Sequence, residues 1–269
     1  MKPSRTKNPS ASINIGDAVA LGDHRLLCAD SRDAGLIGRF LRNEKISLIL
    51  TDPPYGVAYV EGKASFSGKA KKHTAILNDQ SQTDGEYRRF TKEWLEAARP
   101  SLTRKNALYV FNSDKMLFPL REGMIDAGFR FAQLLIWMKT NVVVGRMDYL
   151  PQHELIAYGW HGTHQFMKGK DKSVLIYPKP NRSTLHPTMK PVGLLRNLIL
   201  NSSRIGDTVY DPFGGSGSTL LACEQTKRKC LMVELSPEYC QTIIKRFEKL
   251  TGDKAQTLPS LLPHDSQKK

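Results

Sequence analysis

Residues 208–219 of the chain read Thr-Val-Tyr-Asp-Pro-Phe-Gly-Gly-Ser-Gly-Ser-Thr. An apolar stretch that ends in Asp211 is followed by a glycine-rich turn, and a second apolar stretch begins at Leu220. A strand, a glycine turn and a helix in this order are typical of an α/β fold, because glycine lets the backbone approach a ligand closely. The stretch therefore predicts a parallel sheet with a ligand site at the carboxyl end of this strand.

Three further apolar stretches also end in an acid: 26–30 in Asp30, 46–52 in Asp52 and 230–234 in Glu234. One acid at a strand end is more often a turn or cap residue. Ligands of open parallel sheets, however, bind beyond the carboxyl ends of the strands. If the strands are neighbours, these acids and Asp211 are expected to converge on one site.

The chain is expected to fold as a single α/β domain over residues 15–250. Short apolar strands alternate there with amphipathic helices, which predicts a mostly parallel sheet with helices on both faces. The ends, 1–14 and 251–269, are expected to be flexible tails. Two segments, near 57–82 and 161–184, carry Lys, Gly, His and Ser without apolar periodicity, and we expect them to be long basic arms.

Composition narrows the class of protein. The 269 residues include 40 Lys and Arg against 26 Asp and Glu, a formal net charge of +14. This excess of positive charge favours a nucleic-acid partner. The alternative is that the charge only keeps the protein soluble. We find no signal peptide or membrane-spanning stretch, so a cytoplasmic location is expected. The cysteines lack the spacing of a zinc site or a disulfide framework, and no metal is predicted.

The glycine turn has a limited range of ligands. It lacks the Lys of a P-loop, and Leu220 stands where a dinucleotide-binding turn has its third small residue. Glu234 ends the next strand, where an acid can accept hydrogen bonds from ribose hydroxyls. This combination suits a ligand that contains adenosine but no pyrophosphate.

A second turn, Thr-Asp-Pro-Pro-Tyr-Gly at residues 51–56, offers acceptors beside an aromatic ring. Two prolines fix the backbone and remove two N–H donors, which leaves carbonyl and carboxylate oxygens. Such a corner suits an amino group on a planar ring: Asp52 and the Pro53 carbonyl would hold its hydrogens while Tyr55 stacks on the ring. The alternative is a rigid turn with Tyr55 packed in the core.

Together these turns resemble the motifs of S-adenosylmethionine-dependent DNA amino-methyltransferases, the N6-adenine and N4-cytosine family. The Asp-Pro-Pro-Tyr motif at 52–55 precedes Asp-Pro-Phe-Gly-Gly-Ser-Gly at 211–217, and His-Pro-Thr-Met-Lys-Pro lies at 186–191. This order is similar to that of the circularly permuted beta class. The resemblance covers roughly residues 18–250 and implies a Rossmann-like methyltransferase fold.

The resemblance also implies roles for individual residues. The catalytic residues would be Asp52, Pro53, Pro54 and Tyr55. The cofactor would be bound by Asp30, His186, Lys190, Asp211, Phe213, Gly215, Ser216, Gly217 and Glu234. Within this set Glu234 would hold the ribose, Asp30 would approach the adenine, and Lys190 with Asp211 would hold the methionine end. The positive charge of the two arms, which flank these motifs, predicts separately that DNA is bound by Lys69, Lys71, Lys72, Lys168, Lys170 and Lys172. Gly56 departs from the family pattern, since many relatives have Asn there.

The implied activity is transfer of a methyl group from S-adenosylmethionine to the N6 amine of adenine in double-stranded DNA, after the base flips out of the duplex. Adenine is favoured because adenine enzymes usually begin the catalytic motif with Asp, as at Asp52, while cytosine-N4 enzymes often begin it with Ser. Alternatives are an N4-cytosine enzyme, an amine methyltransferase of RNA or protein, and a non-catalytic nucleic-acid-binding module. A homodimer, a cognate restriction endonuclease and a bacterial or phage source are compatible with this family.

Overall fold

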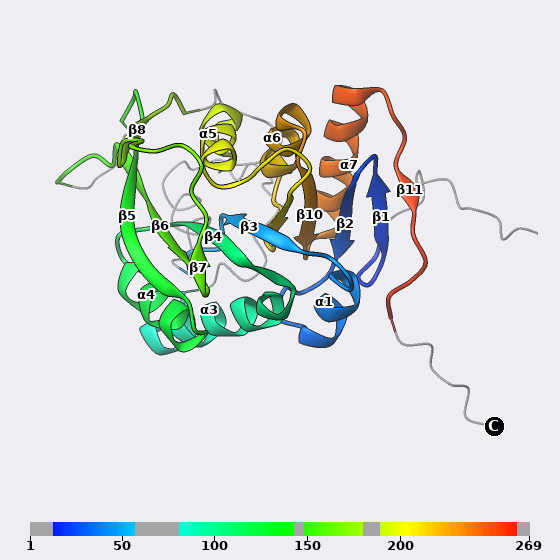
Figure 1. The fold of residues 1–269 in the computed structure, drawn as a ribbon, viewed down its shortest axis with the longest axis horizontal. Coiled ribbons are helices and arrows are strands. Elements are labelled where there is room, and N and C mark those ends of the chain that lie inside the picture. Colours follow the sequence, from blue (N-terminus) through cyan, green and yellow to red (C-terminus); the bar gives the residue numbers. More distant parts are fainter. Residues whose placement is uncertain (1–12, 57–80, 143–147, 180–188, 263–269) are drawn as a thin grey trace, which may run out of the picture.

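A single twisted sheet runs through the computed structural model of the protein (Figure 1). The structure describes residues 13–56, 81–142, 148–179 and 189–262. The strands within these ranges are β1 (Ala18–Leu21), β2 (His24–Cys28), β3 (Ile46–Thr51), β4 (Leu102–Asn112), β5 (Arg130–Met138), β6 (His153–Trp160), β7 (Thr163–His164), β8 (Val174–Ile176), β9 (Thr208–Asp211), β10 (Lys229–Glu234) and β11 (Gln256–Thr257).

The centre of the sheet is parallel. The spatial order is β11-β1-β2-β10-β9-β3-β4-β6-β5-β8, with β7 paired to β4. The strands from β2 to β4 in this order all run in one direction. Antiparallel pairs lie on both flanks, β1 with β2 on one side and β6 with β4 and β5 on the other. The predicted mostly parallel sheet is therefore confirmed.

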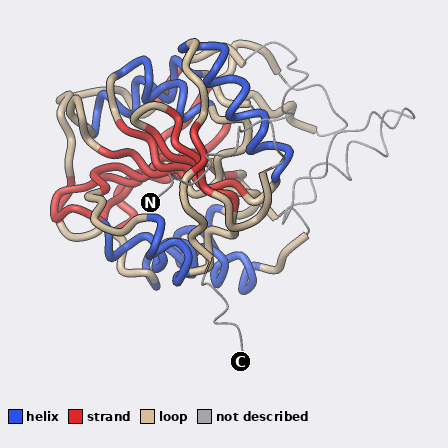
Figure 2. The backbone as a smooth tube through the Cα atoms, turned by 90° about the vertical axis from the view of Figure 1, so that its right-hand side faces the viewer, coloured by secondary structure: helices blue, strands red, loops and turns tan. Residues whose placement is uncertain are grey.

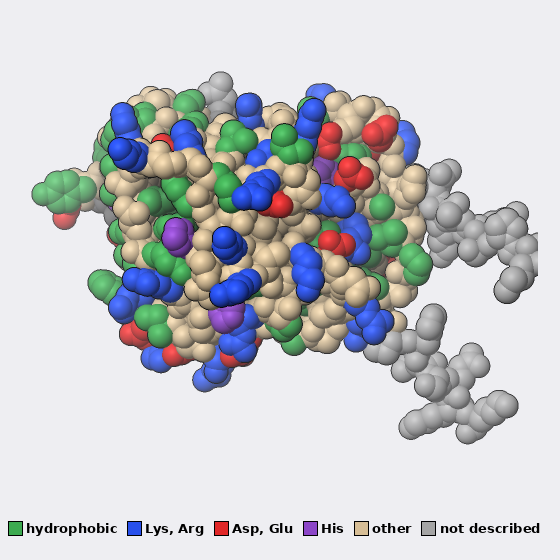
Figure 3. All heavy atoms as spheres, in the orientation of Figure 1, with side chains coloured by type: hydrophobic (Ala, Val, Ile, Leu, Met, Phe, Trp, Pro, Cys, Tyr) green, Lys and Arg blue, Asp and Glu red, His purple; other side chains and the backbone are tan. Residues whose placement is uncertain are grey.

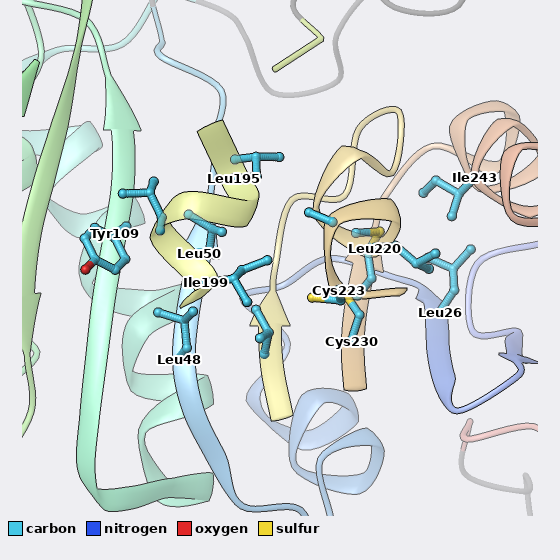
Figure 4. Close-up of a cluster of buried hydrophobic side chains, with 14 of the residues drawn as sticks. Leu26, Leu48, Leu50, Tyr109, Leu195, Ile199, Leu220, Cys223, Cys230 and Ile243 are labelled. Carbon is cyan, nitrogen blue, oxygen red and sulfur yellow. The ribbon is translucent and has the colours of Figure 1, made fainter. Parts of the chain in front are cut away.

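Helices cover both faces of the sheet (Figures 1 and 2). On one face lie α1 (Ala34–Phe40), α3 (Asp84–Ala98), the 3-10 turn η1 (Arg99–Ser101) and α4 (Leu117–Asp126), and on the other lie α5 (Val192–Ser202), α6 (Ser218–Thr226) and α7 (Pro237–Thr251). Alternate strand residues point to opposite faces. Leu48 and Leu50 of β3 thus join the cluster under α5 to α7 (Figure 4), whereas Ile49 joins the cluster under α1, α3 and α4.

Local sequence explains where two of these helices begin. Thr83 and Glu86 form a reciprocal capping box at the start of α3, in which each side chain accepts a hydrogen bond from the other residue's backbone N–H. The Ser236 side chain accepts from the Tyr239 N–H, and Pro237 occupies the first turn of α7. None of the described helices has the length and apolar character needed to cross a membrane.

The expectation of a flexible C-terminal tail from residue 251 is wrong for residues 251–262. Gly252 ends α7 in a left-handed conformation, with φ of 84°. The chain then pairs β11 with β1, and Ala255 between the two elements is buried. An edge strand has unpaired backbone groups, and β11 satisfies those of β1. A two-residue strand is too short to produce an alternating pattern. At the other end Ile13, expected in the N-terminal tail, is also buried.

The basic segment expected near 161–184 is not a free arm over its described part. Residues 163–164 form β7, and 174–176 form β8 beside β5. Between the two strands the Met167 N–H donates to the Asn201 carbonyl at the end of α5. Backbone pairing with the sheet, which needs no apolar periodicity, holds this segment down. Most of the other expected arm, residues 57–80, lies outside the described residues.

Candidate active site

The acid-ended strands are neighbours. The strands β2, β10, β9 and β3 are adjacent in the sheet and run in the same direction. The last residues of β10 and β9 are acids, an acid follows β3 directly, and an acid follows β2 after one intervening residue. Asp30, Glu234, Asp211 and Asp52 therefore stand along one edge of the sheet. The Ala29 N–H donates to the Glu234 carbonyl at 3.1 Å, which fixes the first two of these acids side by side. The four acids thus lie at the ends of four adjacent strands, as expected, and their meeting at one ligand site stays a prediction.

The loop after β9 requires its glycines. Gly215 and Gly217 have φ of 51° and 80°, a left-handed conformation that glycine adopts without strain. A Cβ on Gly214 would lie 2.6 Å from Cγ of Met232. Gly217 is also the N-cap of α6. The loop thus turns tightly at the start of a helix, where backbone N–H groups point outward.

Glu234 lies between this loop and the start of α7. Its Oε2 accepts the Gly215 N–H at 2.7 Å, and its Oε1 accepts the Ser236 N–H at 2.7 Å. Burial raises the pKa of Glu234 to about 7, against the effect of these hydrogen bonds. Each carboxylate oxygen retains acceptor capacity, so two adjacent hydroxyls of a ligand can still bind.

Asp211 is the buried acid of the same loop. Its Oδ1 accepts the Thr51 hydroxyl at 2.7 Å and the Phe213 N–H at 3.1 Å. Burial raises the pKa of Asp211 to about 7 as well, and the charge of Asp52 adds to the shift. Burial therefore raises the pKa of both carboxyl groups next to the glycine loop, those of Asp211 and Glu234.

Phe213 and Asp30 border the glycine loop on the side of α3. The Phe213 ring lies 5.5 Å from that of Phe90 and 5.6 Å from that of Trp94. Asp30 forms an ion pair with Arg32, with 2.6 Å between Oδ2 and Nη2. Burial raises the pKa of Asp30, but the Arg32 hydrogen bonds outweigh it, so the pKa is lowered. A cavity of about 350 Å³ lies next to this ion pair; Arg32, Gln82 and Phe90 are among its lining residues, and Asp30 and Phe213 are not.

In the Asp-Pro-Pro-Tyr turn, the Asp52 carboxylate contacts the side chains of Tyr55 and Lys190. The Tyr55 hydroxyl donates to Oδ1 of Asp52 at 2.8 Å, and Nζ of Lys190 lies 2.5 Å from Oδ2. Burial raises the pKa of Asp52, and the charge of Lys190 opposes this shift. Burial lowers the pKa of Lys190, but Asp52 and Glu154 outweigh it and the pKa is raised. The pair is therefore a half-buried carboxylate and a buried ammonium.

Glu154 and Lys139 belong to the same cluster and were missed by the sequence analysis. Oε2 of Glu154 lies 3.1 Å from Nζ of Lys190, and Oε1 lies 2.8 Å from Nζ of Lys139. The register of β5 and β6 pairs Trp137 with Glu154 and so brings the two charges together. The available signal was weak: a charged residue at the edge of each of two apolar stretches.

Other predicted site residues lie elsewhere. Lys190, expected beside Asp211, instead contacts Asp52 and Glu154, because the segment before α5 enters the site next to β3 and β6. Lys168 lies beside α5, 3.8 Å from Asp171 and 3.4 Å from Asn197, and Lys170 and Lys172 are exposed. His186, Lys69, Lys71 and Lys72 lie outside the described residues. Within the described ranges, no cluster of His, Cys, Asp and Glu is suited to a metal ion.

A comparison with protein families identifies the class of enzyme. The N6_N4_Mtase model, described as DNA methylase, matches residues 46–246, which include both the Asp-Pro-Pro-Tyr turn and the glycine loop. The chain belongs to this DNA methylase family. The DNA methylase is an amino-methyltransferase of the N6-adenine and N4-cytosine kind, as the motifs of its sequence indicated.

Curated relatives of this DNA methylase are type II methyltransferases. M.HpaI of Haemophilus parainfluenzae is 26% identical over 252 residues, with 84% of this chain and 74% of the relative covered. M2.MboI of Moraxella bovis is 23% identical over 236 residues, with 78% and 83% covered.

Solved structures share the fold of this DNA methylase. The complex of M1.HpyAVI with SAM has a TM-score of 0.61 at 24% identity and covers 82% of this chain and 98% of that one. The cytosine-N4-specific PvuII DNA methyltransferase has a TM-score of 0.66 at 19% identity, with 89% and 94% covered. A putative DNA modification methylase of Thermus thermophilus, TTHA0409, complexed with S-adenosyl-L-methionine, has a TM-score of 0.59 at 20% identity, with 84% and 93% covered. The predicted Rossmann-like methyltransferase fold is confirmed.

Proposed function

We propose that this DNA methylase transfers a methyl group from S-adenosylmethionine to the exocyclic N6 amine of adenine in double-stranded DNA. One observation carries the proposal: the Asp52 carboxylate, paired with Lys190 and bonded by Tyr55, stands on the same sheet edge as the glycine loop. The Asp52 carboxylate, which can accept a hydrogen bond from an amine, therefore lies next to the glycine loop, which suits adenosine.

The glycine loop fits the methyl donor. Glu234 presents a half-buried carboxylate with free acceptor capacity to ribose hydroxyls, and Gly215 and Gly217 add no side chain at two positions of the loop. Phe213 and Asp30 border the same region, and Asp211 lies between it and Asp52. When bound there, S-adenosylmethionine supplies an electrophilic methyl group on a positively charged sulfur.

The residues of the catalytic turn prepare the amine. An exocyclic amine is a poor nucleophile because its lone pair is delocalised into the ring. Asp52 and the Pro53 carbonyl accept hydrogen bonds from its two N–H groups, which leaves the lone pair free to attack the methyl group. Lys190 keeps Asp52 ionised and acceptor-only, and the carboxylate stabilises the positive charge that develops on the amine. Base flipping brings the amine to this turn.

Adenine is preferred over cytosine because of the acceptor at position 52. A carboxylate is a stronger acceptor than a hydroxyl and has no proton of its own to compete with the amine. The cytosine amine offers the same pair of N–H groups, so an N4-cytosine product is the principal alternative.

The surface and the relatives suggest the macromolecular partners. Lys and Arg side chains are spread across the face of the molecule seen in Figure 3, in keeping with a net charge of +14. DNA phosphates are contacted in this proposal by Lys168, Lys170, Lys172, Lys69, Lys71 and Lys72. The curated relatives are type II methyltransferases, so we include a cognate restriction endonuclease and a homodimer among the proposed partners.

The identity of the methylated base tests the proposal directly. Duplex DNA of mixed sequence is incubated with the protein and methyl-labelled S-adenosylmethionine, then hydrolysed to nucleosides and separated. We expect the label on N6-methyladenine. Label on cytosine alone would contradict the choice of base, and label on RNA or protein with none on DNA would overturn the proposed substrate. An Asp52→Asn protein serves as the inactive control.

Cofactor binding is expected to weaken as the pH falls through 7. Ribose hydroxyls bind the ionised form of Glu234, so binding lowers a pKa that is about 7 in the free protein, and protonation at low pH opposes binding. Glu234→Gln should bind the cofactor at least about tenfold more weakly at pH 8, because charge-assisted hydrogen bonds are lost. The affinity of Glu234→Gln for the cofactor should also change less with pH than that of the wild type.

Calorimetric titration of both proteins with S-adenosylmethionine at pH 6, 7 and 8 measures this effect. Glu96→Gln, which changes an exposed acid of α3, is the matched control and should titrate as the wild type does. Equal affinities of wild type and Glu234→Gln at pH 8 would remove Glu234 from the cofactor site.

A further inference from the structure

A row of four alternating charges, two buried ammonium groups and two half-buried carboxylates, ends at the proposed amine site. Lys139, Glu154, Lys190 and Asp52 follow one another with nitrogen–oxygen distances of 2.8, 3.1 and 2.5 Å. The two Lys side chains are only 6% and 7% exposed. The sheet order β3-β4-β6-β5 brings these residues together from distant parts of the sequence. The proposed function uses Asp52 and Lys190 but assigns no part to Glu154 and Lys139.

At rest Glu154 neutralises Lys139, while Lys190 has Asp52 as its counterion. The position of Glu154 suggests another use. Nζ of Lys190 lies 2.5 Å from Asp52 and 3.1 Å from Glu154. The Tyr55 hydroxyl likewise lies 2.8 Å from Asp52 and 3.2 Å from Glu154. Lys190 and Tyr55, which both donate hydrogen bonds to Asp52, therefore each have a second carboxylate, that of Glu154, within hydrogen-bonding distance.

Aromatic rings hold the two ammonium groups in place. Nζ of Lys190 lies 5.2 Å from the centre of the Phe111 ring and 5.6 Å from that of Tyr55. Nζ of Lys139 lies 5.3 Å from the centre of the Trp137 ring. Rings attract a cation through their faces but accept no strong hydrogen bond. The strong hydrogen bonds of the two ammonium groups therefore go to oxygen atoms: Lys139 pairs with Glu154, and Lys190 pairs with Asp52 and Glu154 and also donates to the Tyr55 hydroxyl at 3.3 Å.

Methylation of an amine changes the charge of this site. After the methyl group has been transferred, the amine nitrogen is positively charged and must lose a proton. One N–H bond breaks, its electron pair stays on nitrogen, and the proton forms an O–H bond with the Asp52 carboxylate. Asp52 becomes neutral at that moment. Without another anion nearby, the buried ammonium of Lys190 would then be unpaired, which is strongly unfavourable.

We propose that Glu154, held in place by Lys139, is a positioning residue whose carboxylate serves as the second counterion of Lys190 and keeps Lys190 and Tyr55 paired while Asp52 carries the proton. The inference rests on the proposed function, since it assumes that Asp52 receives the proton of a methylated amine. It adds two residues, Glu154 and Lys139, that act on Asp52 through Lys190 and Tyr55.

The acidities of the two carboxyl groups agree with these roles. Burial raises the pKa of Glu154, but the charges of Lys190 and Lys139 outweigh it and bring the pKa to about 2. Burial raises the pKa of Asp52, and Glu154 adds to the shift while Lys190 and Tyr55 oppose it. Asp211 lies close enough to interact with Asp52 as well. Of the two carboxyl groups that face Lys190, Asp52 is therefore the better proton acceptor, and Glu154 stays ionised.

Two substitutions test the proposal through opposite effects on Asp52. Glu154→Gln removes the negative charge, so Asp52 becomes less basic and the acidic limb of the pH profile of kcat moves to lower pH, by about one pH unit. Lys139→Met leaves the charge of Glu154 less compensated, so the same limb moves to higher pH. In Glu154→Gln we also expect kcat to fall at least about tenfold, with the KM for DNA and the Kd for S-adenosylmethionine within about twofold of wild type.

Three further proteins complete the experiment. Glu154→Asp retains the charge and should recover most of the lost kcat. Lys92→Met and Glu96→Gln alter an exposed pair on α3 with a nitrogen–oxygen distance of 4.0 Å, and both should match the wild type. If Glu154→Gln does not fold, Lys139→Met and Glu154→Asp provide the comparison. Unchanged kcat and pH profiles in Glu154→Gln and Lys139→Met, with an active wild type, would overturn the proposal.

A measurement without substrate separates this inference from the proposed function. Carbon-13 NMR of labelled aspartate carboxyl groups follows the titration of Asp52 in the free protein. We expect its pKa to be lower in Glu154→Gln and higher in Lys139→Met than in the wild type. An unaltered titration in both variants overturns the coupling whatever the substrate is, whereas a wild type that methylates no DNA overturns the proposed function.

Discussion

Replacing Asp52 with Asn is expected to reduce methyl transfer to DNA by at least about a thousandfold, with little change in the affinity for S-adenosylmethionine. The amide is nearly the same size but carries no charge, so it stabilises neither the cationic amine nor Lys190. Its NH2 group also donates hydrogen bonds where the amine needs an acceptor. Glu234 and the glycine loop, which we propose bind the cofactor, are unaltered.

Single-turnover methyl transfer at saturating DNA, together with calorimetric binding of the cofactor, measures both parts of this result. Asp253→Asn, a change at an exposed acid after α7, controls for the substitution itself. An Asp52→Asn protein that retained more than about a tenth of the wild-type rate would show that Asp52 is not the acceptor of the amine.

Replacing Lys190 with Met is expected to lower the free energy of unfolding by about 3–5 kcal/mol at pH 8, because it leaves the half-buried carboxylate of Asp52 without its cation. Met has a similar length and suits the Phe111 ring, so few packing contacts are lost. Lys139 still neutralises Glu154, and the effect therefore falls mainly on Asp52.

The pH dependence of this loss has a definite sign. Without Lys190 the pKa of Asp52 rises further above its unfolded value, and the folded protein binds a proton that the unfolded chain has released. The free energy of unfolding then falls as the pH rises through the shifted pKa, so the loss is larger at pH 8 than at pH 5. Urea unfolding at both pH values measures it. The exposed Lys92→Met should change stability by less than about 1 kcal/mol, and a Lys190→Met protein as stable as that control at pH 8 would contradict the prediction.

The parts of the site that could be predicted are those with a local signature. Asp211, Glu234 and Asp52 each end a short apolar stretch, and a parallel sheet carries such ends to one edge. The glycines at 214–217 could be recognised because a tight turn needs them. Each of these inferences needs only a few consecutive residues and a general rule of sheet geometry.

The parts that could not be predicted depend on pairing between distant strands. Lys139 and Glu154 come together through the antiparallel register of β5 and β6, which no short stretch of sequence contains. Lys190 was assigned to Asp211, yet its partner is decided by where the segment before α5 meets β3 and β6. The strand β11 is recognisable only from the unpaired edge of β1 that it covers.

The pairing of β11 with β1 also has a bearing on the order of the motifs. It brings the first and last strands of the described chain together at one edge of the sheet (Figure 1). Leu262 lies against Gly16 there. A short linker could join the chain there into a ring without moving a strand. Opening that ring between β8 and α5 would place the glycine loop before the Asp-Pro-Pro-Tyr turn, with every neighbour in the sheet retained. The active site depends on which strands are adjacent, and the point at which the ring is cut leaves that adjacency unchanged.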